Sequence, residues 1–202
     1  MTTPGEDGVR IPVRRVRLED AAAIAAIYAP IVRETATSFE AEPPDAAEME
    51  RRIRRTADHL PWLVGVRVSE SGEEDVIGYA FATPYRSRAA YRWSVEVSVY
   101  VDESARGRGI ARSLYSRLHA LLRDQGYRIT YAVITLPNPA SVRLHEALDY
   151  RQIGVFRCAG YKLAAWHDVL WMRREIAPLV DEPGEPVPLG RLDPAAIDAV
   201  LG

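Results

Sequence analysis

One glycine-bearing segment, residues 99–111, constrains what this chain can fold into more than any other part of it. The segment reads VYVDESARGRGIA: a strand-like run, a short polar turn, and the start of a long amphipathic pattern. Within it, Arg106, Gly109 and Ala111 fit the spacing Arg/Gln-x-x-Gly-x-Gly/Ala. Small residues let a backbone approach a ligand closely, and free N–H groups gather at the positive end of a helix. The segment therefore predicts a strand-to-helix junction that binds a pyrophosphate.

Composition places the chain in a broad class. Its 202 residues, 48% of them hydrophobic, suffice for one sizeable core and favour a single domain. The 26 basic and 28 acidic residues nearly balance, so no overall field attracts nucleic acid or an anionic membrane. The single cysteine, Cys158, excludes an internal disulfide and fits a reducing compartment. The start of the chain is unlike a signal peptide, and no apolar run reaches the ~18 residues of a membrane span. We expect a cytoplasmic protein without nucleic-acid or membrane partners.

Periodicity and turn residues divide the chain into three parts. We expect residues 1–10 to be disordered, one domain over 11–177, and a Pro-rich extension over 178–202 with a short terminal helix. Hydrophobic patterns predict the elements inside the domain. Strands are expected at about 11–18, 62–68, 76–83, 93–101, 127–135, 152–158 and 169–176, and helices at about 21–28, 45–58, 110–126 and 139–148. The order is that of a mixed α/β single domain.

The strand before the glycine segment carries a candidate general base. Alternation places Glu96 on the polar face of strand 93–101, opposite the valine face. In a central strand this carboxylate would be partly desolvated, which raises its pKa toward values useful for catalysis. On the pattern alone, a solvated glutamate on an edge strand fits equally well.

The helix expected at 139–148 supplies further candidates. Asn138 is a favoured cap, and the Pro that follows is tolerated at the first helical position. Ser141 and His145 are i, i+4 neighbours on one face. An imidazole with a near-neutral pKa can serve either proton transfer, although a lone histidine on a helix is commonly a packing residue.

Several further motifs accompany these residues in a fixed order. They are PWLV at 61–64, AYRW at 90–93, EVSVYV at 96–101, LPN at 136–138, SVRLHEAL at 141–148 and WHD at 166–168. Together they resemble the GCN5-related N-acetyltransferase (GNAT) superfamily, and within it the phosphinothricin and methionine sulfoximine/sulfone acetyltransferases. The resemblance spans about residues 12–176. It implies a GNAT-type domain with a central mixed, mostly antiparallel twisted sheet flanked by helices.

The resemblance also implies a co-substrate, acetyl-coenzyme A, and no metal. The loop amides would hold the pyrophosphate, the preceding strand would pair with the pantetheine arm, and Asn138 would contact its amides. The implied coenzyme residues are Val99, Tyr100, Val101, Arg106, Gly107, Arg108, Gly109, Ile110, Ala111, Asn138 and Ser141. Glu96 matches the glutamate that deprotonates the amine in these enzymes. In the wider superfamily a tyrosine general acid often occupies the position of His145. The phosphinothricin-type branch has a histidine there, as this chain does.

A basic and aromatic run, residues 85–93, is the candidate acceptor site. Arginine provides a bidentate fork for a carboxylate or for phosphinate and sulfonyl oxygens. Arg86, Arg88 and Tyr91 are the candidates, and a basic loop exposed to water is the alternative. The implied function is acetyl transfer to a small amino-acid-like acceptor, in the class that confers herbicide or antibiotic resistance. Acetylation of a polyamine or a protein N-terminus, and non-catalytic acyl-CoA binding, are the alternatives. The family commonly forms homodimers.

Four residues outside the site carry their own expectations. Asp149 stands where the family normally carries glycine, at a helix end that often needs a left-handed backbone. Tyr115 and Trp166 are expected to be packing residues. Cys158 is expected to be a small core residue within an apolar strand.

Overall fold

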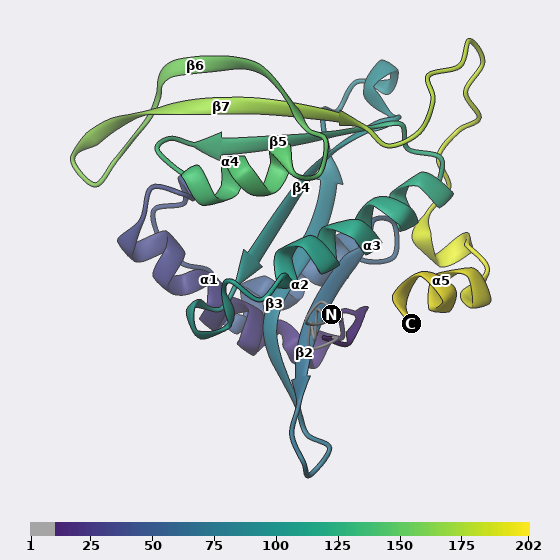
Figure 1. Ribbon diagram of the computed structural model, residues 1–202, viewed down its shortest axis with the longest axis horizontal. Helices are drawn as coiled ribbons and strands as arrows, with labels where there is room; N and C mark the ends of the chain where they lie inside the picture. The colour runs from purple at the N-terminus through teal and green to yellow at the C-terminus, as the bar shows by residue number, and fades with distance from the viewer. Residues whose placement is uncertain (1–10) are drawn as a thin grey trace, which may run out of the picture.

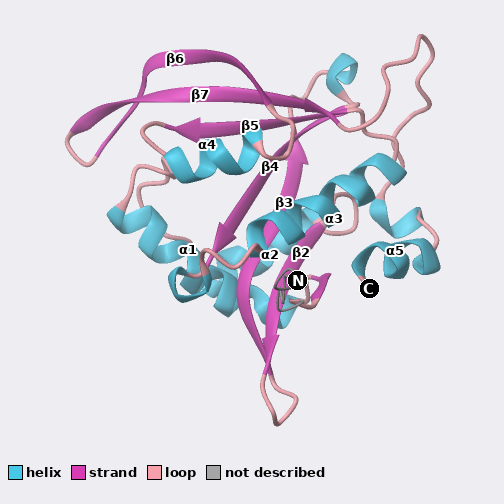
Figure 2. Ribbon diagram, in the orientation of Figure 1, coloured by secondary structure: helices cyan, strands magenta, loops and turns pink. Residues whose placement is uncertain are grey.

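One seven-stranded sheet organises the computed structural model, which describes residues 11–202 (Figures 1 and 2). The strands are β1 (Val13–Arg15), β2 (Trp62–Val68), β3 (Glu74–Pro84), β4 (Ser94–Val101), β5 (Ile129–Thr135), β6 (Arg151–Lys162) and β7 (Ala165–Glu175). The helices of at least one full α-turn are α1 (Ala21–Glu34), α2 (Ala46–Thr56), α3 (Ile110–Asp124), α4 (Pro139–Glu146) and α5 (Pro194–Leu201). The predicted disorder of residues 1–10 lies outside the described residues.

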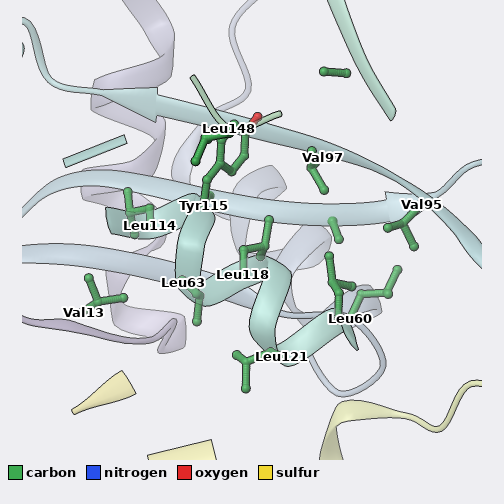
Figure 3. Close-up of a cluster of buried hydrophobic side chains, with 14 of the residues drawn as sticks. Val13, Leu60, Leu63, Val95, Val97, Leu114, Tyr115, Leu118, Leu121 and Leu148 are labelled. Atoms are coloured by element: carbon green, nitrogen blue, oxygen red, sulfur yellow. The ribbon is translucent and has the colours of Figure 1, made fainter. Parts of the chain in front are cut away.

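The sheet confirms the predicted architecture. Its strand order is β1-β2-β3-β4-β5-β7-β6, and every pair is antiparallel except β4 with β5. Two apolar clusters cover its two faces. One joins α1 and α2 to the sheet, and the other surrounds α3. The α3 cluster includes Val13, Leu60, Leu63, Val95, Val97, Leu114, Tyr115, Leu118, Leu121 and Leu148 (Figure 3). Tyr115 is 1% exposed, which confirms its packing role.

The parallel pair β4–β5 is short, and this shortness creates the site. The two strands pair only at Ser94 with Ile129, Val95 with Thr130, and Glu96 with Tyr131. Beyond Glu96, β4 continues to Val101 without pairing to β5, whereas β3 stays paired along its other edge. The β5-facing backbone groups of residues 97–101 therefore face a cleft, and Glu96 stands where the cleft begins.

Two predicted element boundaries were wrong, one because of packing in the core and one because of cross-strand pairing. Helix α1 continues to Glu34, through Pro30, because Ile31 and Val32 extend its buried face. The β6–β7 hairpin extends to Lys162 and Ala165.

Two predicted packing roles in that hairpin were also wrong. Cys158 is exposed, at a bulge in β6 where the register shifts and its backbone φ is 49°. Trp166 is 64% exposed on β7.

The start of α2 and the end of α3 follow the predicted capping chemistry. Asp45 accepts a hydrogen bond from the Glu48 amide at 2.7 Å and caps α2. Gly126, with φ of 99°, follows α3 directly after its C-cap. Asp149 has a φ of 62°, so the left-handed turn forms without glycine. Over residues 11–202, no helix has both the length and the apolar character needed to cross a membrane.

Candidate active site

A cavity of about 610 Å³ lies at the open end of the β4–β5 cleft. Its lining residues are Ile31, Thr35, Thr37, Val99, Tyr100, Val101, Ala105, Arg106, Gly107, Gly109, Ile110, Ala111, Arg112, Asn138, Ala140, Ser141, Arg143 and Leu144. The cavity thus brings together every predicted coenzyme residue except Arg108, which is exposed outside it. Its charged lining residues are three arginines, with no carboxylate, which suits a polyanionic ligand.

The glycine segment is shaped as an anion cradle. Gly107 and Gly109 both have φ of 77°, a conformation that L side chains rarely adopt. A Cβ at either glycine would point into open space, so packing does not explain these residues. Gly109 caps the 15-residue helix α3, whose first amides have no intrahelical partners. Backbone donors and the helix dipole therefore converge on the cavity, as pyrophosphate binding requires.

Helix α4 forms the opposite wall through its capped first turn. The Asn138 side chain accepts a hydrogen bond from the Ser141 amide at 3.1 Å. Both residues line the cavity. The cap confirms the predicted start of the helix and presents polar groups toward the cavity.

Glu96 lies at the head of the cleft, on the sheet face that packs against α1 and α2. Its side chain is 30% exposed, and Arg86 donates a hydrogen bond to its carboxylate at 3.2 Å. Burial raises the pKa of Glu96, and the nearby Arg86 guanidinium partly opposes that rise. The strand is central, which is the setting in which a base role was expected.

An aromatic floor holds Arg86 beside Glu96. The Arg86 guanidinium lies over the Tyr85 ring at 4.4 Å and near Trp171 at 5.4 Å. Tyr85 stacks on Tyr131 with ring centroids 4.2 Å apart. Tyr131 is the β5 partner of Glu96, so both side chains emerge on the same face.

The other two predicted acceptor residues lie on the same loop. Tyr91 contacts Tyr85 edge to face at 5.5 Å and is 40% exposed. Arg88 is exposed and precedes the short 3-10 helix Ala89–Tyr91. This loop, residues 85–93, is called the acceptor loop below. It brings one cation, Arg86, to the Glu96 carboxylate and carries further cationic and aromatic groups on the same exposed segment.

A second cavity, of about 330 Å³, opens on the Glu96 face one strand away. Thr83, which pairs with Glu96, lines it together with Phe81, Trp62 and Tyr79. The rings of Trp62 and Phe81 stack at 4.2 Å. This aromatic wall can contact an apolar group one strand away from Glu96, whereas Glu40, Glu48, Arg52 and Arg55 give another part of the cavity lining a charged character.

His145 lies away from both cavities. It is 3% exposed, and its ring packs edge to face on Tyr115 and Tyr150 at 5.3 and 5.0 Å. The Nδ1–H donates to the Ser141 carbonyl at 2.8 Å, which leaves Nε2 without a partner among the described residues. Burial lowers the pKa of His145, and the bond to Ser141 partly opposes this. A hydrogen bond to Ser141, which lines the cavity, therefore links the His145 ring to it.

Sequence reasoning missed several residues of the two sites. Arg112 and Arg143 line the larger cavity. Their positive charge near the predicted pyrophosphate site could have identified them as candidate coenzyme-binding residues. Tyr131 follows from alternation along β5, but only once β5 is known to neighbour β4. Thr35 and Thr37 carried no signal, because they reach the cavity from the segment after α1.

Comparison with known proteins gives the family. The family described as acetyltransferase (GNAT) domain matches residues 13–171. The phosphinothricin N-acetyltransferase of Streptomyces viridochromogenes is 38% identical over 178 residues, which cover 88% of this chain and 94% of that protein. The L-methionine sulfoximine/L-methionine sulfone acetyltransferase of Salmonella typhimurium is 33% identical, over 78% of this chain and 90% of that protein.

A solved structure is also similar. It is a phosphinothricin acetyltransferase from Sinorhizobium meliloti in complex with AcCoA, 34% identical, with a TM-score of 0.81 over 90% of this chain and 97% of that one. The fold, the anion cradle and these matches define an acetyltransferase, and the chain belongs to the GNAT family. Within that family it is of the phosphinothricin and methionine sulfoximine type.

Proposed function

We propose that the protein transfers an acetyl group from acetyl-CoA to the α-amino group of a small amino-acid-like acceptor of the phosphinothricin, methionine sulfoximine or methionine sulfone class. One observation carries the proposal: a partly buried carboxylate, Glu96, stands where β4 and β5 separate, between an anion cradle and a cationic loop. A base at that position can act on an amine that meets a ligand held in the cleft.

Acetyl-CoA, when bound, supplies a thioester that an amine can attack without a covalent enzyme intermediate. The amides of 107–111 would hold its pyrophosphate, with Arg106, Arg112 and Arg143 adding positive charge. The unpaired backbone of 97–101 would hydrogen-bond its pantetheine arm as a neighbouring strand does. The acetyl-CoA complex of the S. meliloti relative supports this choice of co-substrate.

Glu96 would remove one proton from the acceptor. An α-amino group arrives as an ammonium ion and has no lone pair until it loses that proton. The raised pKa of Glu96 makes its carboxylate a stronger base than an exposed glutamate. The free amine then attacks the thioester carbonyl and the bond to sulfur breaks. The attacking nitrogen loses its second proton as the amide forms, and the departing thiolate takes up that proton.

Arg86 and Arg88 would bind the acidic groups of the acceptor. An α-amino acid carries its carboxylate two bonds from the amine, so a cation close to the base orients both groups. Arg86 already reaches Glu96 at 3.2 Å and rests on an aromatic floor. The aromatic wall of the second cavity offers space for the apolar part of the acceptor's side chain.

His145 enters the proposal as a secondary candidate. Its bare Nε2 can accept a proton, whereas its lowered pKa disfavours the imidazolium form that a general acid requires. Its bond to Ser141 gives it a second way to act, by holding the first turn of α4 against the cavity.

A thiol-release assay with acetyl-CoA and a panel of amines tests the proposal. The panel contains methionine sulfone, methionine sulfoximine, phosphinothricin, spermidine and a short peptide with a free N-terminus. Turnover confined to the first three amines supports the proposal. Turnover on spermidine or the peptide points to the alternative acceptors, and coenzyme binding without turnover on any amine points to a non-catalytic module.

The proposal extends to assembly and location. The β6–β7 hairpin exposes Ile153, Phe156 and Trp166 at 56%, 59% and 64%, which favours burial against a second copy of the chain. We therefore propose a homodimer, which light scattering after gel filtration would detect as about twice the monomer mass. A cytoplasmic location stays a prediction from the single cysteine.

A further inference from the structure

The chain after β7 forms a strap, residues 178–202, that passes the acceptor loop before it reaches α3 (Figure 1). The GNAT domain match ends at residue 171, and no motif in the sequence explained this segment. Its side chains belong to the core nevertheless. Leu189 is 0% exposed and Ile197 is 5% exposed, and both join the buried cluster around α3. The strap is therefore part of the folded domain.

A set of hydrogen bonds fixes the middle of the strap. Gln125, at the end of α3, donates from its side chain to the carbonyls of His59 and Val187 at 2.7 and 2.8 Å. The Val187 amide donates back to the Gln125 carbonyl at 2.8 Å. The Leu189 and Gly190 amides donate to the carbonyls of His59 and Asp58. The strap is thus held rigidly only a few residues from Gly184.

Residues 184 and 185 of the strap contact the C-terminal end of the acceptor loop. The indole N–H of Trp93 donates to the Gly184 carbonyl at 2.8 Å. The neighbouring Arg92 pairs with Glu185. Both contacts fall at the last two residues of the loop, immediately before β4 begins at Ser94.

Trp93 links the strap to the sheet as well as to the loop. Its carbonyl accepts hydrogen bonds from the Arg128 and Ile129 amides at 2.9 and 3.2 Å, where β5 begins. The opposite end of the loop is tied at Tyr85, whose amide donates to the Ser94 carbonyl at 3.4 Å. The loop between these ends is exposed at residues 86–92. Its position therefore depends on how its two ends are held.

From these contacts we infer that Trp93 is a positioning residue for the acceptor loop, and that it acts through the Gly184 carbonyl of the strap. The strap fixes the C-terminal end of the loop, and the loop then presents Arg86 beside Glu96. Glu96 lies on β4, which the sheet holds on both sides at that position. Loss of the strap contact should therefore weaken acceptor binding and leave the chemical step unchanged. This inference rests on the proposed function, which assigns the loop to the acceptor.

The test is Trp93→Phe, which keeps an aromatic ring and removes the N–H. Steady-state kinetics should show an acceptor KM about three- to tenfold higher, the range that one intramolecular hydrogen bond supplies. The kcat and the KM for acetyl-CoA should stay within twofold of the wild-type values. Trp166→Phe is the matched control and should leave the acceptor KM unchanged. Trp166 lies at the start of β7, away from the strap, and phenylalanine keeps an aromatic ring on the surface proposed for the dimer.

A second pair of variants keeps the inference testable if Trp93→Phe does not fold. Glu185→Gln removes the ion pair with Arg92 and should raise the acceptor KM by up to about fivefold at low ionic strength, but not at high salt. Ile197→Ala weakens α5 docking without touching Gly184, so it should lower the Tm and leave the acceptor KM unchanged.

The outcomes separate this inference from the proposed function. A wild-type protein that acetylates none of the amines contradicts the proposed function. The strap inference alone is overturned if the wild-type protein acetylates an amino acid but the acceptor KM does not change. This applies to Trp93→Phe and to Glu185→Gln at low salt. Equal changes in kcat and in both KM values also overturn it, because they indicate a general loss of structure.

Discussion

Glu96→Gln is the substitution that most sharply tests the proposed chemistry. The amide matches the carboxylate in shape, and its oxygen can still accept the hydrogen bond that Arg86 donates at 3.2 Å. The variant therefore keeps the local packing and loses only the ability to take a proton. Removing a positioned acid–base group typically costs about two to four orders of magnitude in rate, or about 3–5 kcal/mol in activation free energy. We expect kcat to fall by that factor while the Kd for acetyl-CoA stays within twofold.

The pH dependence provides a second readout of the same variant. Burial raises the pKa of Glu96, and the protonated form cannot act as a base. The wild-type kcat/KM should therefore fall as the pH drops through that raised pKa, and Glu96→Gln should lose this acidic limb. The pH dependence of folding stability runs in the opposite direction to that of the rate. The raised folded pKa means that Glu96 stabilises the fold below its unfolded pKa and that this contribution is lost as the pH rises through the folded pKa. At neutral pH the variant should be at least as stable as the wild type.

The assay for this variant is stopped-time thiol release across pH 5 to 9 with saturating acetyl-CoA, together with calorimetric binding of the coenzyme. Glu70→Gln, in the exposed turn between β2 and β3, is the matched control. Near-normal turnover of Glu96→Gln would refute the base role, and so would a retained acidic limb. A large loss of coenzyme affinity would instead place Glu96 among the binding residues.

Three further variants test the cradle, the strap and α4. Gly109→Ala forces a φ of 77° on an L residue and adds a methyl group to the anion cradle. Steady-state kinetics should show a KM for acetyl-CoA at least tenfold higher. An unchanged KM would contradict the role of the cradle in coenzyme binding. Leu189→Ala truncates a fully buried side chain and should lower the free energy of unfolding by about 2–5 kcal/mol in urea titrations, whereas an appended, unpacked tail would show no change. His145→Asn should lower kcat but keep the acidic limb if His145 only holds Ser141 in place; loss of that limb would make it a proton-transfer group.

The sequence predicted the local structure of the candidate site where short-range patterns carry the information. The glycine spacing, the Asn138 cap and the alternation that isolates Glu96 are all local, and each appears in the structure as expected. Local capping rules also placed the start of α2 at Asp45. These features depend on neighbouring residues only, so periodicity and capping chemistry suffice to find them.

The errors occur where long-range packing decides. The apolar run around Cys158 suggested a core strand, but β6 is an edge strand whose hairpin extends beyond the domain core. The catalytic role of His145 stays a prediction, but its helical position alone did not indicate that its side chain packs on Tyr115 and Tyr150. The terminal helix α5 was predicted, but the part of the strap before it contains no periodic signal. Leu189 becomes a core residue because hydrogen bonds with Gln125 and His59 hold the backbone beside α3. None of these arrangements can be inferred from residues close in sequence.

Product identification tests the central claim most directly. Wild-type protein, acetyl-CoA and L-methionine sulfone would be incubated together, and the product analysed by NMR and mass spectrometry alongside thiol release. The account predicts one N-acetylated amino acid, modified at its α-nitrogen, for each thiol released. Thiol release without an acetylated amine, or acetylation at any other atom, would contradict it.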